Sequence, residues 1–275
     1  MTASPDSIRP TPGKTSDAVP AARRGRVLAV TSGKGGVGKT LVCANLAAAL
    51  ARRGERVLVI DADLGLANLD VVLNLQPKVT LHDVFTGKAV WEDALLDAPG
   101  GFKVLLAGSG LIEYSRLTPE VREQLQGLIA EVAPRYDRIL LDTGAGISDV
   151  VLYAVSLADE VLIVATPEPT AMADAYATIK VLATQQQRSH LLLLVNQTRK
   201  TGEGRAVAQQ LQTVLDRFVT LPDGQHPKLR FLGDVALDNA VREAVQRRQL
   251  LLGTYPGAAA SLALLQIAAR LLDAS

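Results

Sequence analysis

The sequence has little cysteine, few aromatic residues and almost no net charge. Its 275 residues include one cysteine, Cys43, with 4% aromatic residues and a formal net charge of +1. One cysteine excludes an internal disulfide, a zinc site built from cysteines and an iron–sulfur cluster ligated by a single chain. A balanced charge gives no reason to expect nucleic acid as the main partner. The chemistry must therefore depend on other residue types.

Long apolar runs are also missing. No stretch reaches the roughly 18 uninterrupted apolar residues that a membrane span requires, and the first residues lack the apolar core of a signal peptide. The composition, 48% hydrophobic and 21% charged, is typical of a globular protein with a sizeable core. At roughly 150 residues per domain, the length allows one large domain or two small ones. We expect a cytoplasmic protein.

Residues 1–25 differ in composition from the rest of the chain. They lack the apolar spacing of a strand or helix, and among their Ser, Thr and Ala residues they carry Pro5, Pro10, Pro12 and Pro20. Such a segment cannot bury enough apolar area to offset its ordering entropy, so we predict a disordered arm. Its basic end could contact an acidic partner, although a solvated linker is the simpler interpretation of Arg23, Arg24 and Arg26. Residues 26–275 are predicted to form one domain.

From Arg26 onward, short apolar runs alternate with helical patterns. Continuous apolar runs suit strands buried on both faces of a parallel sheet, and they occupy residues 27–30, 57–60, 139–141, 161–164 and 191–195. Helical spacing links Met172 to Ala183, and residues 40–53 are rich in helix formers. This order predicts a doubly wound α/β fold with a mainly parallel sheet, helices on both faces and ligands at the C-terminal strand ends.

The most informative stretch, residues 31–40, follows the first run and precedes a helix. Gly33, four further residues and then Gly38-Lys39-Thr40 make a complete P-loop. Its glycines let backbone N–H groups surround a phosphate, Lys39 reaches the reacting β and γ oxygens, and the Thr40 hydroxyl ligates Mg²⁺. The nucleotide-binding residues predicted here are Gly33, Gly35, Gly36, Val37, Gly38, Lys39, Thr40 and Leu41.

A second lysine, Lys34, lies inside the loop, where an ordinary P-loop needs none. From the residues alone, a solvated lysine is an equally good reading. The run from Lys34 to Thr40, KGGVGKT, resembles the deviant Walker A signature of the MinD/ParA family of P-loop ATPases. The resemblance implies that Lys34 is a catalytic residue that also contacts the nucleotide held by a second copy of the chain. It therefore implies an ATP-dependent homodimer whose hydrolysis is slow in isolation.

Carboxylates follow two other predicted strands. Asp61 and Asp63 follow the 57–60 run, and Asp142 follows the 139–141 run before a glycine-rich loop. An aspartate at a strand end can simply cap a turn, but beside a P-loop it is well placed to act on Mg²⁺ and water. Residues 138–148 have the form of a Walker B site, in which Asp142 holds Mg²⁺. The resemblance implies that Asp63 orients the attacking water and that Asp61 supports the Mg²⁺ shell.

The base site is predicted at the end of the 191–195 run. Asn196 resembles the adenine-reading asparagine of the family, and the alternative is an asparagine that only ends a strand. Residues 231–238 resemble the loop that packs near the base. Residues 196–199 lack the Lys and Asp of a guanine-reading Asn-Lys-x-Asp motif. Together with the family resemblance, this favours ATP as the cofactor, with Mg²⁺.

Within the family, the chain resembles the FlhG/FleN branch of flagellar regulators. Residues 61–70, 142–148 and 166–180 carry this resemblance, which extends over residues 26–272. It implies a switch ATPase that controls flagellar number or placement. The partners it implies are an FlhF-like GTPase, flagellar switch-complex proteins or a flagellar transcription factor. Residues 1–25, however, lack the Asp-Gln-Ala motif with which many members stimulate the GTPase.

The C-terminal segment departs from the amphipathic membrane helix of MinD-like proteins. Its one cation is Arg270, and its predicted packing stripe consists of Leu262, Leu265, Ala269 and Leu272. We therefore predict the last core helix of the domain rather than a membrane anchor. Peripheral binding at the inner face of the cell membrane or at a flagellated pole has only weak support.

Two other function classes stay open. A ParA-like DNA-positioning ATPase would share the ATP site and add a basic surface. Candidates for that surface are Arg242, Arg247 and Arg248 on a helix predicted over residues 237–250, although a solvated face is the simpler reading. A small-molecule ligase or kinase would need an acceptor pocket, and no sequence feature identifies one.

Overall fold

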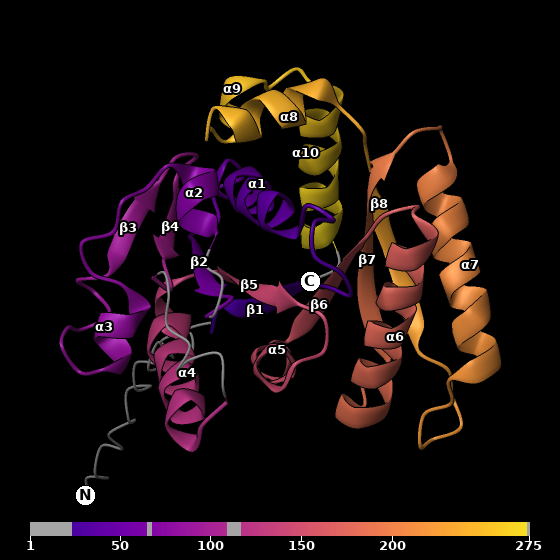
Figure 1. Ribbon diagram of the computed structural model, residues 1–275, viewed down its shortest axis with the longest axis horizontal. Coiled ribbons are helices and arrows are strands. Elements are labelled where there is room, and N and C mark those ends of the chain that lie inside the picture. The colour runs from indigo at the N-terminus through magenta and orange to yellow at the C-terminus, as the bar shows by residue number, and fades with distance from the viewer. Residues whose placement is uncertain (1–23, 65–67, 109–116, 274–275) are drawn as a thin grey trace, which may run out of the picture.

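The computed structural model describes residues 24–64, 68–108 and 117–273. They form an eight-stranded sheet in the order β3-β4-β2-β5-β1-β6-β7-β8 (Figure 1). Neighbouring strands run parallel except β3 and β4. The bounds are β1 (Arg26–Ser32), β2 (Val57–Ala62), β3 (Leu95–Ala98), β4 (Phe102–Leu105), β5 (Arg138–Ala145), β6 (Glu160–Ala165), β7 (His190–Thr198) and β8 (Lys228–Ala236). The predicted arm, residues 1–25, lies almost entirely outside the described residues.

The central strands are buried on both faces because their sequences are continuously apolar. Every residue of β2 is buried, and in β1 only Arg26 is exposed. Side chains of β1 alternate between two core clusters, with Val27 and Ala29 in one and Leu28 and Val30 in the other. The predicted doubly wound, mainly parallel sheet is confirmed.

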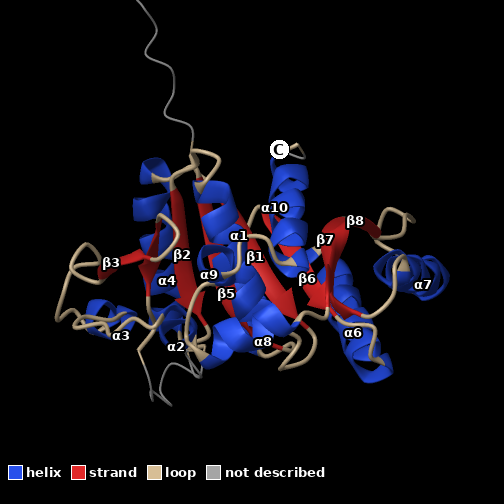
Figure 2. Cartoon of the chain, turned by 90° about the horizontal axis from the view of Figure 1, so that it is seen from above, coloured by secondary structure: helices blue, strands red, loops and turns tan. Residues whose placement is uncertain are grey.

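Helices cover both faces of the sheet (Figure 2). The layer that shares a core cluster with Val27 and Ala29 contains α3 (Leu81–Phe85), α4 (Pro119–Val132), α5 (Asp149–Ser156), α6 (Pro169–Gln186) and α7 (Glu203–Phe218). The layer that packs with Leu28 and Val30 contains α1 (Lys39–Ala51), α2 (Leu69–Leu73), α8 (Asn239–Gln246), α9 (Leu251–Thr254) and α10 (Ala259–Leu272).

Local sequence signals explain several helix boundaries. Thr118 caps α4 by accepting a hydrogen bond from the N–H of Val121, and Pro119 follows at the first helical position. Asp238 caps α8 by accepting from the N–H of Ala240. Gly54 adopts a φ of +89° just after α1, a conformation that glycine tolerates at helix ends. Helix boundaries therefore follow ordinary capping chemistry.

Helix α10 is a core helix, as predicted, but its buried face is not the predicted one. Leu262 is 50% exposed, whereas the fully buried side chains are Ala260, Ser261, Leu264, Ile267, Ala268 and Leu271. The reason is that α10 packs against both α1 and β8, and these two surfaces together select a different side of the helix. Among the described residues, no helix combines the length and apolar character needed to cross a membrane.

Two further predictions need correction. Residues 231–236 form the second half of β8 rather than a loop, and the helix predicted over 237–250 is the shorter α8. Strand β8 lies at the sheet edge and alternates between exposed and half-buried residues over its first half, so it lacks the continuous apolar run that identifies the central strands. The short strands β3 and β4 were not predicted, because four residues carry too little pattern.

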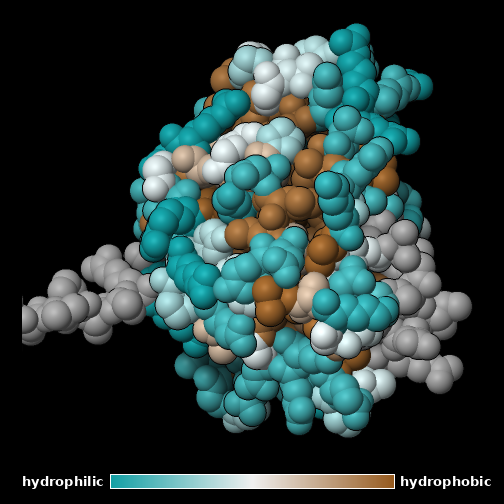
Figure 3. Space-filling model, turned by 90° about the vertical axis from the view of Figure 1, so that its left-hand side faces the viewer, coloured by the Kyte–Doolittle hydropathy of each residue, from teal (hydrophilic) through white to brown (hydrophobic). Residues whose placement is uncertain are grey.

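The opposite edge of the sheet, at β3, faces the viewer in Figure 3, where apolar side chains lie among hydrophilic ones. Exposed or half-buried apolar residues of this region include Val71, Leu75, Val90, Leu95 and Leu96. Strand β3 has only four residues, and a short edge strand limits pairing with other chains. The sheet thus ends on this side without a long open edge.

Candidate functional site

The P-loop connects β1 to α1 at the C-terminal edge of the sheet. Gly36 and Gly38 adopt φ values of +80° and +88°, which most other residues avoid, and α1 begins directly after Gly38. A Cβ at Gly38 would lie 2.5 Å from Nδ2 of Asn196, and a Cβ at Gly33 would lie 2.2 Å from the backbone of Asp174. These glycines therefore permit both the loop conformation and its close packing.

Lys39 and Asp142 form a buried ion pair at the centre of the site. The Lys39 ammonium donates to Oδ1 of Asp142 over 2.8 Å, and the side chains are only 9% and 2% exposed. The Thr40 side chain also lies close to Asp142. Burial raises the pKa of Asp142, while the charge of Lys39 opposes that shift. The predicted phosphate-binding lysine and the two predicted metal ligands Thr40 and Asp142 are thus brought together.

Asp61 lies beside this pair because β2 and β5 are in register at Asp61 and Asp142. Its Oδ1 accepts a hydrogen bond from the N–H of Asp63 over 3.2 Å, whereas its buried Oδ2 has no hydrogen-bond partner among the described residues. Burial, and secondly the charge of Asp142, raise the pKa of Asp61 well above its usual value. A buried carboxylate oxygen without a partner is suited to receive a metal-bound water.

The arrangement fits Mg²⁺ bound together with a nucleotide. Within the described part of the chain, no three His, Cys, Asp or Glu side chains group into a metal site. Mg²⁺ is commonly held by one or two carboxylates together with substrate phosphates and waters, so such a group is not needed. Thr40 and Asp142 would provide the protein contacts, and Asp61 would accept a bound water. The three residues predicted for the metal are therefore compatible with it.

Replacement of Asp61 by Asn should stabilise the protein in the absence of nucleotide. Asp61→Asn keeps the acceptor for the Asp63 N–H and removes a desolvated charge, which we expect to raise the free energy of unfolding by about 1–2 kcal/mol at neutral pH. The raised pKa of Asp61 gives the wild type extra protons in the folded state, so the advantage of the variant should shrink as the pH falls. Thermal unfolding between pH 5 and 8 measures this. If Asp61→Asn were stabilised by the same amount at every pH in this range, the desolvated charge of Asp61 would not be the cause.

Strand β5 continues past Asp142 to Ala145, so the glycine-rich loop begins later than predicted, and the strand end and this loop are both attached to β1. The Thr143 hydroxyl donates to the Val30 carbonyl over 3.1 Å, and the N–H of Gly146 donates to the Ser32 carbonyl over 2.8 Å. Gly144 faces Asp63, because a Cβ at Gly144 would lie 3.4 Å from Oδ1 of that carboxylate. Asp63 therefore lies next to the end of β5, just before the loop that would rearrange when a γ-phosphate leaves. Residues 65–67 of the adjoining segment lie outside the described residues.

Lys34 is not part of the buried cluster. Its ammonium donates to Oε1 of Glu168 over 3.0 Å and to the Thr170 hydroxyl over 2.8 Å, and its side chain is 38% exposed. The Thr170 hydroxyl, and secondly Lys34, lower the pKa of Glu168. The structure thus separates the two P-loop lysines, one buried on Asp142 and one at the surface.

Glu168 has no role in the sequence-based hypothesis. It precedes α6 and lies shortly after β6, so it belongs to the same C-terminal edge as the P-loop. Its position after a predicted strand could have identified Glu168 as a candidate site residue, because charged residues after parallel strands gather at one edge of a sheet. The pairing with Lys34 could not be inferred, since 133 residues separate the two in the chain.

Asn196 hydrogen-bonds through both ends of its amide, and one of them holds the P-loop. Nδ2 donates to the Val37 carbonyl over 2.8 Å, and Oδ1 accepts from the N–H of Gln197 over 2.9 Å. One amide hydrogen and one lone pair remain for a base. The adjacent cavity, of about 290 Å³, is lined by Gly38, Leu41, Asn196, Gln197, Ala236, Leu237, Asp238, Val241, Arg242 and Val245. The cavity lies beside the P-loop and is compatible with a base. Its lining includes Asn196, which the sequence predicts at the base, and Leu41, which it predicts among the nucleotide-binding residues.

The chain is similar to known flagellar and cell-division proteins. A family model described as an AAA domain matches residues 25–193. The antiactivator FleN of Pseudomonas aeruginosa is 42% identical over 243 residues, which are 88% of this chain and 85% of that protein. The flagellum site-determining protein YlxH of Helicobacter pylori is 32% identical, over 90% of this chain and 82% of that one.

A solved structure agrees with the fold. The septum site-determining protein MinD of Pyrococcus horikoshii, complexed with Mg-ADP, superimposes with a TM-score of 0.70 at 25% identity over 90% of this chain and 95% of that one. That structure and this chain share the parallel-sheet fold that carries the P-loop between β1 and α1. Together these findings show that the chain belongs to the MinD/ParA family of P-loop ATPases, on the branch that contains the flagellar regulators FleN and YlxH.

Proposed function

We propose that the chain is an ATP-dependent dimerising switch that regulates the number or placement of flagella. The observation that carries the proposal is that the two P-loop lysines have different positions and different contacts. Lys39 is buried on Asp142, where it would hold the nucleotide of its own chain, whereas Lys34 lies at the surface on Glu168. An exposed lysine beside the phosphate loop is available to a second copy of the chain.

The residues of the site suggest how hydrolysis proceeds. The P-loop backbone and Lys39 would bind the phosphates of ATP, and Asn196 would contact the base. Mg²⁺, when bound, would neutralise phosphate charge. Asp63 would hold the attacking water in line with the γ-phosphate, and Lys34 of the second copy would stabilise the charge that develops on the phosphate oxygens. Hydrolysis would then remove the γ-phosphate that joins the two copies, and the dimer would dissociate into monomers.

The output of such a cycle is a difference in partner affinity between nucleotide states. The names of the two relatives, an antiactivator and a flagellum site-determining protein, support a flagellar role. We propose as partners an FlhF-like GTPase, flagellar switch-complex proteins or a flagellar transcription factor. We also propose a cytoplasmic location, with peripheral membrane or polar association as a further possibility to test.

A DNA-positioning role is the second candidate function. Arg242, Arg247 and Arg248 are exposed on or just after α8, although Arg247 lies 4.0 Å from Glu243 in an ion pair. ATP-dependent DNA binding that weakens steeply with salt would support this candidate. The flagellar relatives leave it with less support than the first.

Replacement of Lys34 by Ala tests the proposal. Because Lys34 contacts Glu168 and Thr170 rather than the buried cluster, Lys34→Ala should bind ATP with nearly the affinity of the wild type but should not dimerise. Nucleotide titration and light scattering on the same sample measure both properties. Lys180→Ala, an exposed lysine on α6, is the matched control and should behave as the wild type. If Lys34→Ala bound ATP normally and still formed the ATP-dependent dimer, Lys34 would not act between copies.

A further inference from the structure

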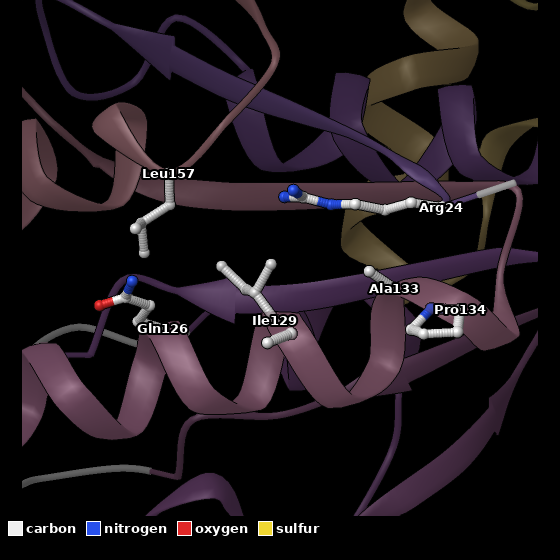
Figure 4. Close-up of a pocket in the computed structure, with 7 residues that line it drawn as sticks. Arg24, Gln126, Ile129, Ala133, Pro134 and Leu157 are labelled. Atoms are coloured by element: carbon white, nitrogen blue, oxygen red, sulfur yellow. The ribbon is translucent and has the colours of Figure 1, made fainter.

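A second cavity, of about 330 Å³, lies at the other end of the sheet from the P-loop. It is a groove between α4 and the end of α5, near the residues that precede β1 and β5 (Figure 4). Apolar atoms of Ile129, Ala130, Ala133, Pro134 and Leu157 provide most of its wall. The nucleotide-site residues described above do not line it, so it requires a separate explanation.

The polar groups of this groove are Arg24 and Gln126. In Figure 4 the side chain of Arg24 extends across the groove, above Ile129 and Ala133. Within residues 24–64, 68–108 and 117–273, the structure gives the Arg24 guanidinium no hydrogen bond or ion pair. The neighbouring cation Arg188 is different, because it donates to the carbonyls of Val155, Ser156, Ala158 and Asp159 at the end of α5. Arg24 is therefore the cation that a ligand in the groove would meet.

The shape of the groove favours an extended peptide. Gln126, Ile129, Ala130 and Ala133 have the spacing of one helix face and follow α4 for two turns, or roughly 10 Å. About three residues of an extended chain cover that length. An aliphatic side chain would bury itself between Ile129 and Leu157, and a neighbouring carboxylate would pair with Arg24. Apolar anchors in pockets and carboxylate–guanidinium pairs are common means of peptide recognition.

We infer that this groove docks a short acidic segment of a partner protein, with one aliphatic side chain in the cavity and a carboxylate on Arg24. For Arg24 the sequence alone favoured a solvated linker, and in this proposal Arg24 binds a carboxylate of the partner. Helix α5 connects the docking groove to the ATP site. Helix α5 begins with Asp149, three residues after Gly146 of the loop attached to β1, and its C-terminal cap, Leu157, lines the groove. This coupling rests on the proposed ATPase cycle, whereas docking itself does not.

The test is a selection from a library of random short peptides displayed on phage, made on the full chain without nucleotide. The selected peptides should contain an aliphatic residue next to Asp or Glu. Fluorescence anisotropy with the synthetic peptide should then show about tenfold weaker binding to Arg24→Glu, because the charge contact becomes repulsive. Ala130→Trp, which fills the groove from an exposed helix position, should abolish binding. Arg24→Lys keeps the charge and should retain most of the affinity.

Controls separate the docking site from the fold and from the ATPase cycle. Arg205→Glu reverses an exposed arginine on α7 and should bind the peptide as the wild type does. Melting temperatures close to that of the wild type show that the variants are folded. If no selected peptide depends on both Arg24 and Ala130, the proposal is wrong, and if decanoate alone binds in a way that depends on both, the groove belongs to a small amphiphile instead. Equal peptide affinity in Mg-ADP and in a non-hydrolysable ATP analogue with Mg²⁺ overturns only the coupling to the nucleotide.

Discussion

Lys39→Ala should lose nucleotide binding, with an affinity for Mg-ATP that falls by at least about a hundredfold. The wild-type ammonium is the buried cation of the site, 2.8 Å from Asp142, and the raised pKa values of Asp61 and Asp142 show how costly their charges are there. Without Lys39, the phosphates of ATP would approach two buried carboxylates with no side-chain cation between them. Isothermal titration with Mg-ATP measures the loss.

The same substitution should also destabilise the fold, since it leaves Asp142 buried without its partner, and breaking a buried ion pair often costs about 3–5 kcal/mol. A double variant separates the two effects. Lys39→Ala combined with Asp142→Asn removes both charges and should recover much of the melting temperature, while nucleotide binding stays lost. If the double variant bound Mg-ATP as tightly as the wild type, Lys39 would have no direct role in phosphate binding.

Asp63→Ala should bind ATP normally but should lose turnover by at least about a hundredfold, the scale expected when a positioned carboxylate is removed. The side chain of Asp63 lies beside Gly144, near the end of β5, and is not part of the buried Lys39–Asp142 pair. Its loss should therefore spare phosphate and metal binding. Steady-state phosphate release, together with nucleotide titration, measures both quantities.

A carboxylate elsewhere provides the control for this prediction. Asp97 lies on β3, is largely exposed and pairs with Lys103 at the surface. Asp97→Ala should keep both binding and turnover. If Asp63→Ala kept its turnover, Asp63 would not position the attacking water, and the other groups near Gly144 would be the next candidates for that role.

The sequence predicted the central part of the fold because that part has the strongest patterns. Continuous apolar runs identified the central strands, and the P-loop motif placed Gly33 to Thr40 between a strand and a helix. Asp61 and Asp142 were predicted to work together, and the register of β2 with β5 puts them side by side. These predictions rest on local rules that the fold does not override.

Other features depend on contacts between distant segments. The buried face of α10 is set jointly by α1 and β8. Residues 231–238 were predicted as a loop from the family resemblance, and the edge strand β8 lacks the continuous apolar run that would have identified it as a strand. The contact of Lys34 with Glu168 joins residues far apart in the chain. The amide of Asn196 was expected to read a base, and its hydrogen bonds to Val37 and Gln197 give it a structural role as well. Such pairings become visible only when the elements are assembled.

The central claim, that ATP joins two copies through Lys34, is tested most directly by the solution mass of Asp63→Ala. Blocking hydrolysis should hold the state that ATP favours, so sedimentation with Mg²⁺ should give a dimer in ATP and a monomer in ADP. The exposed position of Lys34, on Glu168 and Thr170, is the structural basis for that expectation. A monomer in both nucleotides would contradict the account and would shift the interpretation toward an enzyme that acts on a small molecule.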